Sequence, residues 1–223
     1  MEGAVDLPTF KESIYKIEEE DLYLITTSEH ALLGYHAEEI LPGSSLPLRY
    51  IGVSPCFRKE AGAHGRDTKG IFRVHIFEKV EQFIYAKPEQ SWDEFERLIQ
   101  NAEEFFQSLG IPYRVVNVCA GELGAPAAKK YDLEVWLPGQ RKYREAVSCS
   151  NCLDWQSRRL AIRYRDRPGE ETRCVHTLNS TLVATERTII AILENFRNPD
   201  GSVEIPEVLR SYMGGQDRIL PRR

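Results

Sequence analysis

The chain has 223 residues, of which 42% are hydrophobic and 28% are charged, a balance that is typical of a globular protein with one substantial core. No apolar run approaches the roughly 20 residues that a transmembrane helix needs, and the N-terminus lacks a secretory profile, so we expect a cytoplasmic protein with no membrane partner. The formal net charge is −5. It argues against broad, non-specific binding of phosphate backbones, so a nucleic-acid partner would have to meet a local patch.

The first part of the chain alternates between strand and helix patterns. Its periodicity predicts a strand over 21–26, a helix over 28–40, a strand over 47–60 and a long strand over 71–85. Between the last two strands lies a polar, glycine-punctuated loop, 61–70. This loop is longer than a tight hairpin turn, which suggests a role beyond connection.

The clearest helix covers 92–109, where apolar residues recur at helical spacing and Gly110 follows. These residues, which we expect in the core, are Trp92, Phe95, Leu98, Ile99, Ala102, Phe105, Phe106 and Leu109. Further strands are predicted over 113–119, 131–137, 143–148 and 172–178, and a last helix over 182–196. Consecutive strands without a regular βαβ order predict an α+β fold, an antiparallel sheet flanked by helices, in a single domain spanning 1–223.

The five cysteines are predicted to be mostly buried free thiols rather than disulfides. They are Cys56, Cys119, Cys149, Cys152 and Cys174. Cys149 and Cys152 form a C-x-x-C, which can indicate zinc or redox chemistry. No second pair lies at zinc-finger spacing and no βαβ pattern surrounds this one, so zinc is not expected.

Side chains of an extended strand alternate between its faces, and the strand over 71–85 separates polar from apolar residues. One face would carry Arg73, His75, Phe77, Lys79 and Glu81, and the other Phe72, Val74, Ile76, Val80 and Ile84. Arg58 and Glu60 share a face of the preceding strand. Guanidinium groups bind phosphates and an aromatic ring stacks on a purine, so the platform suits ATP and an amino acid. Alternation alone favours a simpler interpretation, a solvated sheet face with cross-strand ion pairs.

Specific sequence segments distinguish these alternatives. FRKEAGAHGRDTKGIFRVHIFEKVEQF, from Phe57 to Phe83, resembles motif 2 of the seryl-tRNA synthetases, which are class II aminoacyl-tRNA synthetases with an antiparallel-sheet fold. LITTSEHALLGYHAEEIL resembles their serine-binding T-x-E segment. REAVSCSNCLDWQSRRLAIRYR and HTLNSTLVATERTIIAILEN resemble the region leading into and through motif 3. The resemblance covers nearly the whole chain and is strongest to archaeal-type members.

The resemblance implies an enzyme, a serine–tRNA ligase, that activates L-serine with ATP and transfers it to the acceptor end of tRNA(Ser). The implied serine-binding residues are Thr27, Ser28, Glu29, Arg58, Glu81, Asn179 and Thr181. The implied ATP-binding residues are Arg58, Glu60, Arg73, Phe77, Glu145, Ser148 and Arg187, with Arg58, Arg73 and Arg187 catalytic. Glu145 and Ser148 would hold Mg²⁺ together with ATP phosphates, since hard oxygen ligands suit that ion.

Several of these residues have simpler interpretations from the sequence alone. Thr27 also fits a helix N-cap, and both roles can hold together. Arg66 and Lys69 fall on the loop that contacts ATP and tRNA in the family, although loop cations are usually just solvated. His64 and His75 are not proposed as general bases, because the carboxylate nucleophile is already ionised at neutral pH.

The chain departs from the family pattern in three ways. The N-terminal coiled-coil arm that grips tRNA is absent, as is motif 1, which builds the family's homodimer interface. Ile76 replaces a glutamine, and by parity we expect it to point into the apolar face. Two alternatives therefore stay open beside the enzyme: a synthetase-derived, non-catalytic binding or regulatory protein, and a serine ligase acting on a non-tRNA carrier.

Overall fold

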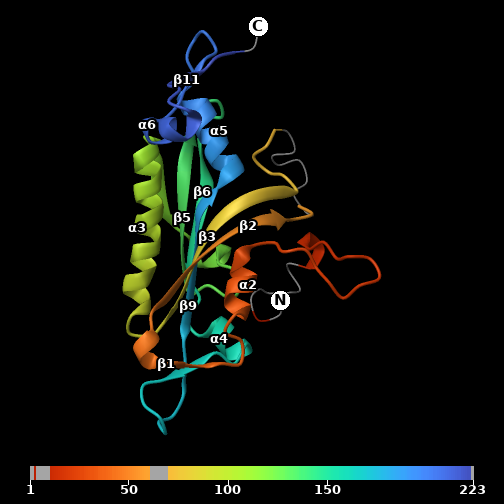
Figure 1. Cartoon of the computed structure of the whole chain (residues 1–223), viewed down its shortest axis with the longest axis vertical. Helices are drawn as coiled ribbons and strands as arrows, with labels where there is room; N and C mark the ends of the chain where they lie inside the picture. Colours follow the sequence, from red (N-terminus) through yellow and green to blue (C-terminus); the bar gives the residue numbers. More distant parts are fainter. Residues whose placement is uncertain (1–2, 4–10, 61–69, 222–223) are drawn as a thin grey trace.

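A computed structural model of the chain describes residues 3, 11–60 and 70–221. Its centre is a six-stranded antiparallel sheet in the order β2-β3-β9-β6-β5-β4 (Figure 1). The strands are β2 (Leu48–Phe57), β3 (Ile76–Ala86), β4 (Tyr113–Asn117), β5 (Lys129–Leu137), β6 (Lys142–Asn151) and β9 (His176–Ala184). This arrangement confirms the predicted fold class.

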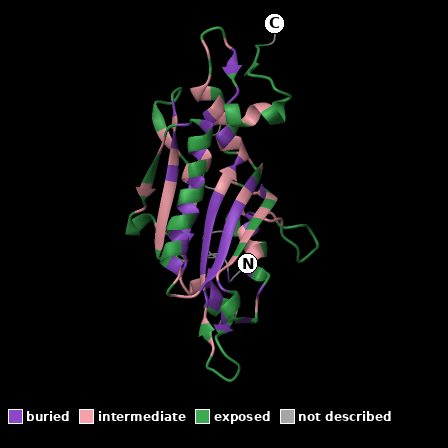
Figure 2. Cartoon of the chain, turned by 60° about the vertical axis from the view of Figure 1, so that its left-hand side comes forward, coloured by how far each residue is buried: buried purple, intermediate pink, exposed green. Residues whose placement is uncertain are grey.

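The long helix α3 (Ser91–Leu109) lies lengthwise against the sheet in Figure 1. Its first turn carries Asp93 and Glu94, which suit the positive end of the helix dipole. Gly110 ends it in the left-handed conformation at φ 71°, which favours glycine. The buried face of α3 packs with the inner sides of β5, β6 and β9 to form the main core, and Figure 2 shows buried strands in the middle of the sheet beside this helix.

Shorter elements complete the fold around the sheet. There are four shorter helices: α2 (Ser28–Gly34), α4 (Trp155–Arg159), α5 (Thr185–Asn195) and α6 (Glu207–Arg210). Short 3₁₀ turns lie at Lys11–Ser13, Gly43–Ser45, Ala120–Glu122 and Ser211–Met213. A small sheet of β1 (Ile40–Pro42), β7 (Arg163–Arg165) and β8 (Arg173–Cys174) lies at one end, and β10 (Val203–Glu204) pairs with β11 (Arg218–Ile219) at the other (Figure 1). Within the described residues, no helix has the length and apolar character needed to cross a membrane.

Several predicted elements need correction. The strand predicted over 21–26 is reduced to an isolated bridge between Lys16 and Tyr23, and the helix predicted over 28–40 ends at Gly34. In the C-terminal half, the strand predicted over 172–178 is divided between β8 and β9, and β9 continues to Ala184, where the helix was expected. Local periodicity predicted the strand over 172–178, but pairing in the sheet extended β9 into residues where a helix was expected.

The most consequential error concerns β3, which begins at Ile76 rather than at residue 71. Ile76 is 62% exposed, so the prediction that it points into the apolar face is wrong. Trp92, expected in the core, is also exposed. From Glu81 to Ala86 both faces of β3 are buried. Helix α3 covers one face of this part of the strand, and helix α2 covers the other. The alternation that the sequence suggests therefore holds only over the first half of β3.

Candidate active site

A cavity of about 340 Å³ opens between the starts of α2 and α5, strands β3, β6 and β9, Arg58 just after β2, and residues 124–130 at the start of β5. Most of the residues singled out from the sequence line it: Thr27, Glu29, Arg58, Phe77, Glu81, Glu145, Ser148, Asn179, Thr181 and Arg187. The other lining groups include His30, Lys79, Lys130, Cys152 and Glu186. Six separate segments of the sequence therefore meet at one concave polar site of a size suited to a small-molecule substrate.

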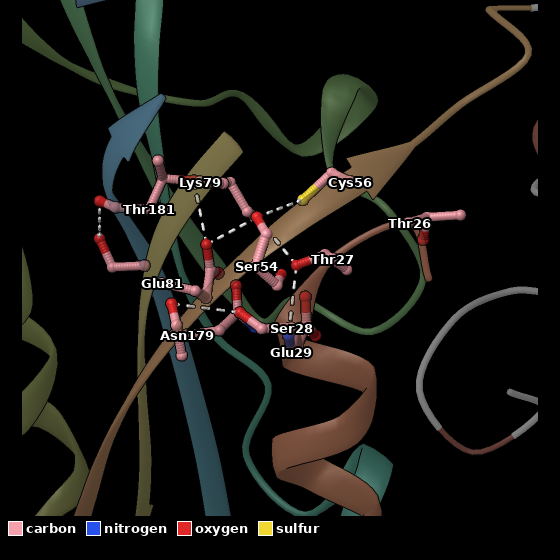
Figure 3. Close-up of polar contacts among 12 residues, drawn as sticks. Thr26, Thr27, Ser28, Glu29, Ser54, Cys56, Lys79, Glu81, Asn179 and Thr181 are labelled. Carbon is pink, nitrogen blue, oxygen red and sulfur yellow. Dashed lines mark hydrogen bonds and ion pairs between the residues drawn. The ribbon is translucent and has the colours of Figure 1, made fainter. Parts of the chain in front are cut away.

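Thr27 caps α2 and also faces the cavity. Its backbone is extended at φ −167°, and its hydroxyl oxygen accepts a hydrogen bond from the backbone N–H of Glu29 at 3.2 Å. The same oxygen accepts a bond from Nζ of Lys79 at 2.8 Å. Figure 3 shows Lys79 reaching between Thr27 and Glu81. The N-cap prediction is confirmed, and the cap fixes the position of an oxygen in the cavity wall.

A buried charged pair lies beside this cap. Nζ of Lys79 is 2.6 Å from Oε2 of Glu81, and the two side chains are 8% and 2% exposed. Thr181, on the neighbouring strand β9, donates its hydroxyl to Oε2 of Glu81 at 3.2 Å. A carboxylate so well buried and oriented is a strong partner for a cationic group, since few water molecules compete for it.

A second carboxylate, that of Glu29, lies on the other side of the cavity and is held by two amides. Its Oε1 accepts hydrogen bonds from Nε2 of Gln156 at 2.8 Å and from Nδ2 of Asn179 at 3.2 Å. Burial, followed by repulsion from Glu81, raises the pKa of Glu29 to about 7. Glu29 is therefore poised to change protonation near neutral pH, and its oxygens suit a small hydroxyl.

Arg58 and Phe77 form the nucleotide-like side of the site. The guanidinium carbon of Arg58 lies 5.2 Å from the centre of the Phe77 ring, and its Nε donates to the backbone oxygen of Thr26 at 3.3 Å. The remaining donors of this fork are available to a phosphate, and the half-buried ring of Phe77 offers an apolar surface for a purine.

Arg187 and Glu145 meet at another wall of the cavity. Nη1 of Arg187 donates to the backbone oxygen of Glu145 at 2.9 Å and lies 3.3 Å from its Oε1. Nε of Arg187 is buried and makes no hydrogen bond, since the nearby Oε1 of Glu186 is 4.0 Å away. An unpaired buried donor is costly unless a ligand satisfies it, which favours an anion at this point.

A β-bulge brings Glu145 and Ser148 onto the same wall. They have opposite parity on β6, so regular alternation would place them on opposite faces. The register with β5 shifts, however, from Leu133 opposite Val147 to Glu134 opposite Glu145, which leaves Ala146 as the extra residue. Asp132 lies directly opposite Ser148, and burial raises the pKa of its carboxyl group.

These oxygen donors fit a hard cation only in combination with a ligand. Glu145 and Ser148 supply carboxylate and hydroxyl oxygens of the kind that Mg²⁺ accepts. Among the described residues, however, no group of three or more His, Cys, Asp or Glu side chains is arranged to hold a metal. Phosphate oxygens would have to complete the coordination sphere. All five cysteines are free thiols.

Three of the predicted site residues do not line the cavity. The hydroxyl of Ser28 points to the backbone oxygen of Gly52 at 3.5 Å, so its predicted contact with serine is not supported. Arg73 and Glu60 form an ion pair with each other near the loop. His64, Arg66 and Lys69 lie outside the described residues.

The sequence interpretation missed several polar residues of the site. Lys79 shared the predicted polar face but received no role, although its parity with Phe77 and Glu81 was a usable signal. Gln156 and Cys152 gave no such signal, because tertiary packing alone brings them to Glu29 and Asn179. Glu186 was missed as well; its side chain is 11% exposed, and its Oε2 has no hydrogen-bond partner.

Fold and site together indicate a class II synthetase core, and residues 10–196 match the family model described as tRNA synthetase class II core domain (G, H, P, S and T). The chain belongs to this family. It is 61% identical over 219 residues to a serine–tRNA ligase from Nitrosopumilus maritimus. The matched region covers 98% of this chain and 52% of that relative. The chain thus spans about half the length of such relatives.

Solved structures give the same result. A seryl-tRNA synthetase from Pyrococcus horikoshii, complexed with ATP, superposes with a TM-score of 0.97 at 63% identity, covering 100% of this chain and 49% of that one. A cytoplasmic serine–tRNA ligase from Naegleria fowleri, in complex with AMP, gives a TM-score of 0.94 at 51% identity and covers 100% and 53%. The resemblance to seryl-tRNA synthetases that the motifs indicated is confirmed.

Proposed function

We propose that this chain is the catalytic domain of a serine–tRNA ligase: it condenses L-serine with ATP to form seryl-adenylate, and then transfers the seryl group to the acceptor end of tRNA(Ser). The carrying observation is that a single cavity joins two chemically different halves. Arg58, Phe77 and Arg187 offer groups for a nucleoside triphosphate, whereas Glu29, Glu81 and Asn179 offer groups for a small hydroxylated amino acid.

Selectivity for serine would come from the end of the cavity around Glu29. Its carboxyl group and the Asn179 amide can both bond the substrate hydroxyl. An amino acid without that hydroxyl would leave these buried groups unpaired, which costs far more than a difference in size. The Glu81 carboxylate, oriented by Thr181, is the partner for the α-ammonium. Thr27 lines the same part of the cavity and completes the proposed serine site.

The reaction requires no covalent bond to the protein. A carboxylate oxygen of serine attacks the α-phosphorus of ATP, the bond from that phosphorus to the bridging oxygen breaks, and pyrophosphate leaves with the electron pair. Arg58 would hold the α-phosphate and the serine carboxylate in line, and Arg187 the γ-phosphate. Glu145 and Ser148 would hold Mg²⁺, which when bound neutralises phosphate charge.

Relatives support this assignment through what they bind. The Pyrococcus horikoshii protein is described in complex with ATP and the Naegleria fowleri protein with AMP, and both align with this chain over its whole length. This chain matches about half of each of those relatives, and the groups that activation needs all line its cavity. Activation is therefore the step that this chain can be asked to perform by itself.

ATP–pyrophosphate exchange tests the proposal directly. We expect exchange that depends on serine, is far weaker with threonine, and is absent with alanine. Arg58→Ala should abolish it, whereas Arg114→Ala, which removes an arginine outside the cavity, should not. Exchange no greater than that of Arg58→Ala would refute the enzyme and leave a non-catalytic binding protein. Charging of tRNA(Ser) would then distinguish tRNA from another carrier.

A further inference from the structure

Lys79 is the most deeply buried cation of the cavity. It is 7% exposed, and its ammonium group lies 2.8 Å from Oγ1 of Thr27 and 2.6 Å from Oε2 of Glu81. Figure 3 shows this side chain lying across the part of the cavity where Glu81 and Thr181 meet. Burying a lysine side chain costs desolvation free energy, so a buried lysine usually needs a nearby negative charge, which Glu81 supplies here.

This pair conflicts with a simple view of substrate binding. In the function proposed above, Glu81 receives the α-ammonium of serine, yet a primary ammonium group already occupies its Oε2. Lys79 and the α-ammonium of an amino acid present the same chemical group, a compact cation with three donors. Both cannot hold the same buried oxygen as their sole counter-charge without leaving excess positive charge in the site.

The zwitterionic form of an amino acid resolves this conflict. Serine carries an ammonium and a carboxylate on one carbon atom, and the pair of Lys79 and Glu81 carries the complementary charges at contact distance. If the two pairs exchange partners, every buried charge keeps a counter-charge and the net charge of the cavity does not change. The four-carbon stem of lysine allows its ammonium group to move by the few ångströms required.

We propose, on the basis of the function assigned above, that serine enters by this exchange: its α-ammonium replaces Nζ of Lys79 at Glu81, and the freed Lys79 binds the serine carboxylate. Lys79 is thus a substrate-binding residue whose ammonium group pairs with Glu81 before serine binds. Together with Arg58 it holds the attacking carboxylate between two cations. The amino acid is recognised as a zwitterion and not only by its hydroxyl group.

The proposal predicts how one variant discriminates between two ligands. L-Serine and L-serinamide share the ammonium and hydroxyl groups, and only serine has a carboxylate. Calorimetric titration of the chain should give tighter binding of serine than of serinamide. Lys79→Met keeps the approximate length of the side chain and removes its charge. It should reduce this preference by roughly 10-fold or more, because losing a charge-assisted hydrogen bond to the serine carboxylate weakens binding by about that factor.

Lys87→Met is the matched control. Lys87 also pairs with a carboxylate, that of Asp166 at 2.6 Å, but it does not line the cavity, so its loss should leave the ratio of serine to serinamide affinity unchanged. An unchanged ratio in Lys79→Met overturns the proposal, and equal weakening of both ligands would mean that Lys79 only neutralises Glu81.

A second measurement uses the unmodified chain, so that the proposal can still be tested if Lys79→Met does not fold. In the unmodified chain, the NMR signal of the Lys79 ammonium should shift when serine is added and shift much less with serinamide; equal shifts would contradict the exchange. The pyrophosphate-exchange assay on the unmodified chain separates the two proposals. Serine-dependent exchange combined with an unchanged ligand ratio in Lys79→Met refutes only the role of Lys79, whereas absence of exchange refutes the function itself.

Discussion

Gln156 and Glu29 are 127 positions apart in the sequence, yet Nε2 of the Gln156 amide lies 2.8 Å from Oε1 of the Glu29 carboxyl group. Gln156 is 0% exposed, and its own Oε1 accepts a hydrogen bond from the hydroxyl of Thr177 at 2.6 Å. A buried amide thus connects the sheet with the carboxyl group that we place against the substrate hydroxyl. The orientation of Glu29 depends on packing that lies behind the cavity.

Replacing Gln156 with methionine should loosen this connection. Gln156→Met removes the donor to Glu29 and leaves the Thr177 hydroxyl without its acceptor, so we expect a loss of about 1–3 kcal/mol in the free energy of unfolding. Serine should also bind more weakly. Urea denaturation and calorimetric titration measure the two effects.

A double-mutant cycle with Thr177→Val is the control. Removing both partners leaves fewer unpaired polar groups, so Gln156→Met with Thr177→Val should cost less than the sum of the single changes. Strictly additive losses would show that the two side chains are not coupled.

The raised pKa of Glu29 predicts a pH-dependent stability. The pKa is about 7 in the folded chain against an ordinary value of 4.5, so the unfolded chain releases this proton first. Folding stability is therefore lost as pH rises from 4.5 to 7, and no further loss occurs above it. Glu29→Gln cannot ionise and keeps the Oε1 acceptor. Its stability relative to the unmodified chain should increase by about 2 kcal/mol between pH 5 and pH 8. Denaturation curves at the two pH values measure this difference, and a difference that is the same at both would contradict the prediction.

An ion pair between β2 and α3 should stabilise the edge of the sheet. Arg49 binds Glu94 with two hydrogen bonds, at 2.7 and 2.6 Å, and the Glu94 side chain is 7% exposed. Arg49→Ala would leave this carboxylate buried with a weaker partner, since Arg97 is 3.9 Å away. We expect the free energy of unfolding to fall by about 1–2 kcal/mol. This is less than a fully buried pair would lose, because the Arg49 side chain is 47% exposed.

The pair of Arg114 and Glu134 provides the comparison. It joins two neighbouring strands, β4 and β5, and its side chains are 55% and 22% exposed. Arg114→Ala should therefore cost less than 1 kcal/mol in thermal or urea denaturation. Equal losses in the two variants would indicate that burial of Glu94 does not determine the strength of the pair.

The sequence predicted most of the sheet and the long helix, because their residues carry local signals. Helical spacing of apolar residues and a terminal glycine defined α3 to within one residue of its observed start. Motif resemblance identified most of the cavity, including Arg58, Phe77 and Arg187. Residues that the cavity excludes, such as Ser28, have the right place in a motif but make their hydrogen bond elsewhere.

What could not be predicted depends on register and on long-range packing. The bulge at Ala146 reverses the parity that would have separated Glu145 from Ser148, and a similar shift between Val80 and Glu81 aligns Glu81 with Thr181. A bulge has no clear sequence signature, because its position depends on the twist of the sheet and on how the strands pair. The role of Lys79 was hidden for another reason: parity places it in the site, but only the structure brings Thr27 to its ammonium group.

The last prediction concerns the thiols. Cys152 lines the cavity, but burial, reinforced by the neighbouring Glu29, holds the pKa of its thiol well above the ordinary value of 9. Burial likewise raises the pKa of Cys149 to about 12. The thiolate is the reactive form, so at pH 8 both groups should resist alkylation, whereas the exposed Cys119 should react. Mass spectrometry after brief iodoacetamide treatment should find label on Cys119 and none on Cys152, and denaturation in urea should make all five thiols reactive. Rapid labelling of Cys152 in the folded chain would show that this end of the cavity is wetter and less apolar than the packing around Glu29 implies, and it would weaken the pH prediction for Glu29 at the same time.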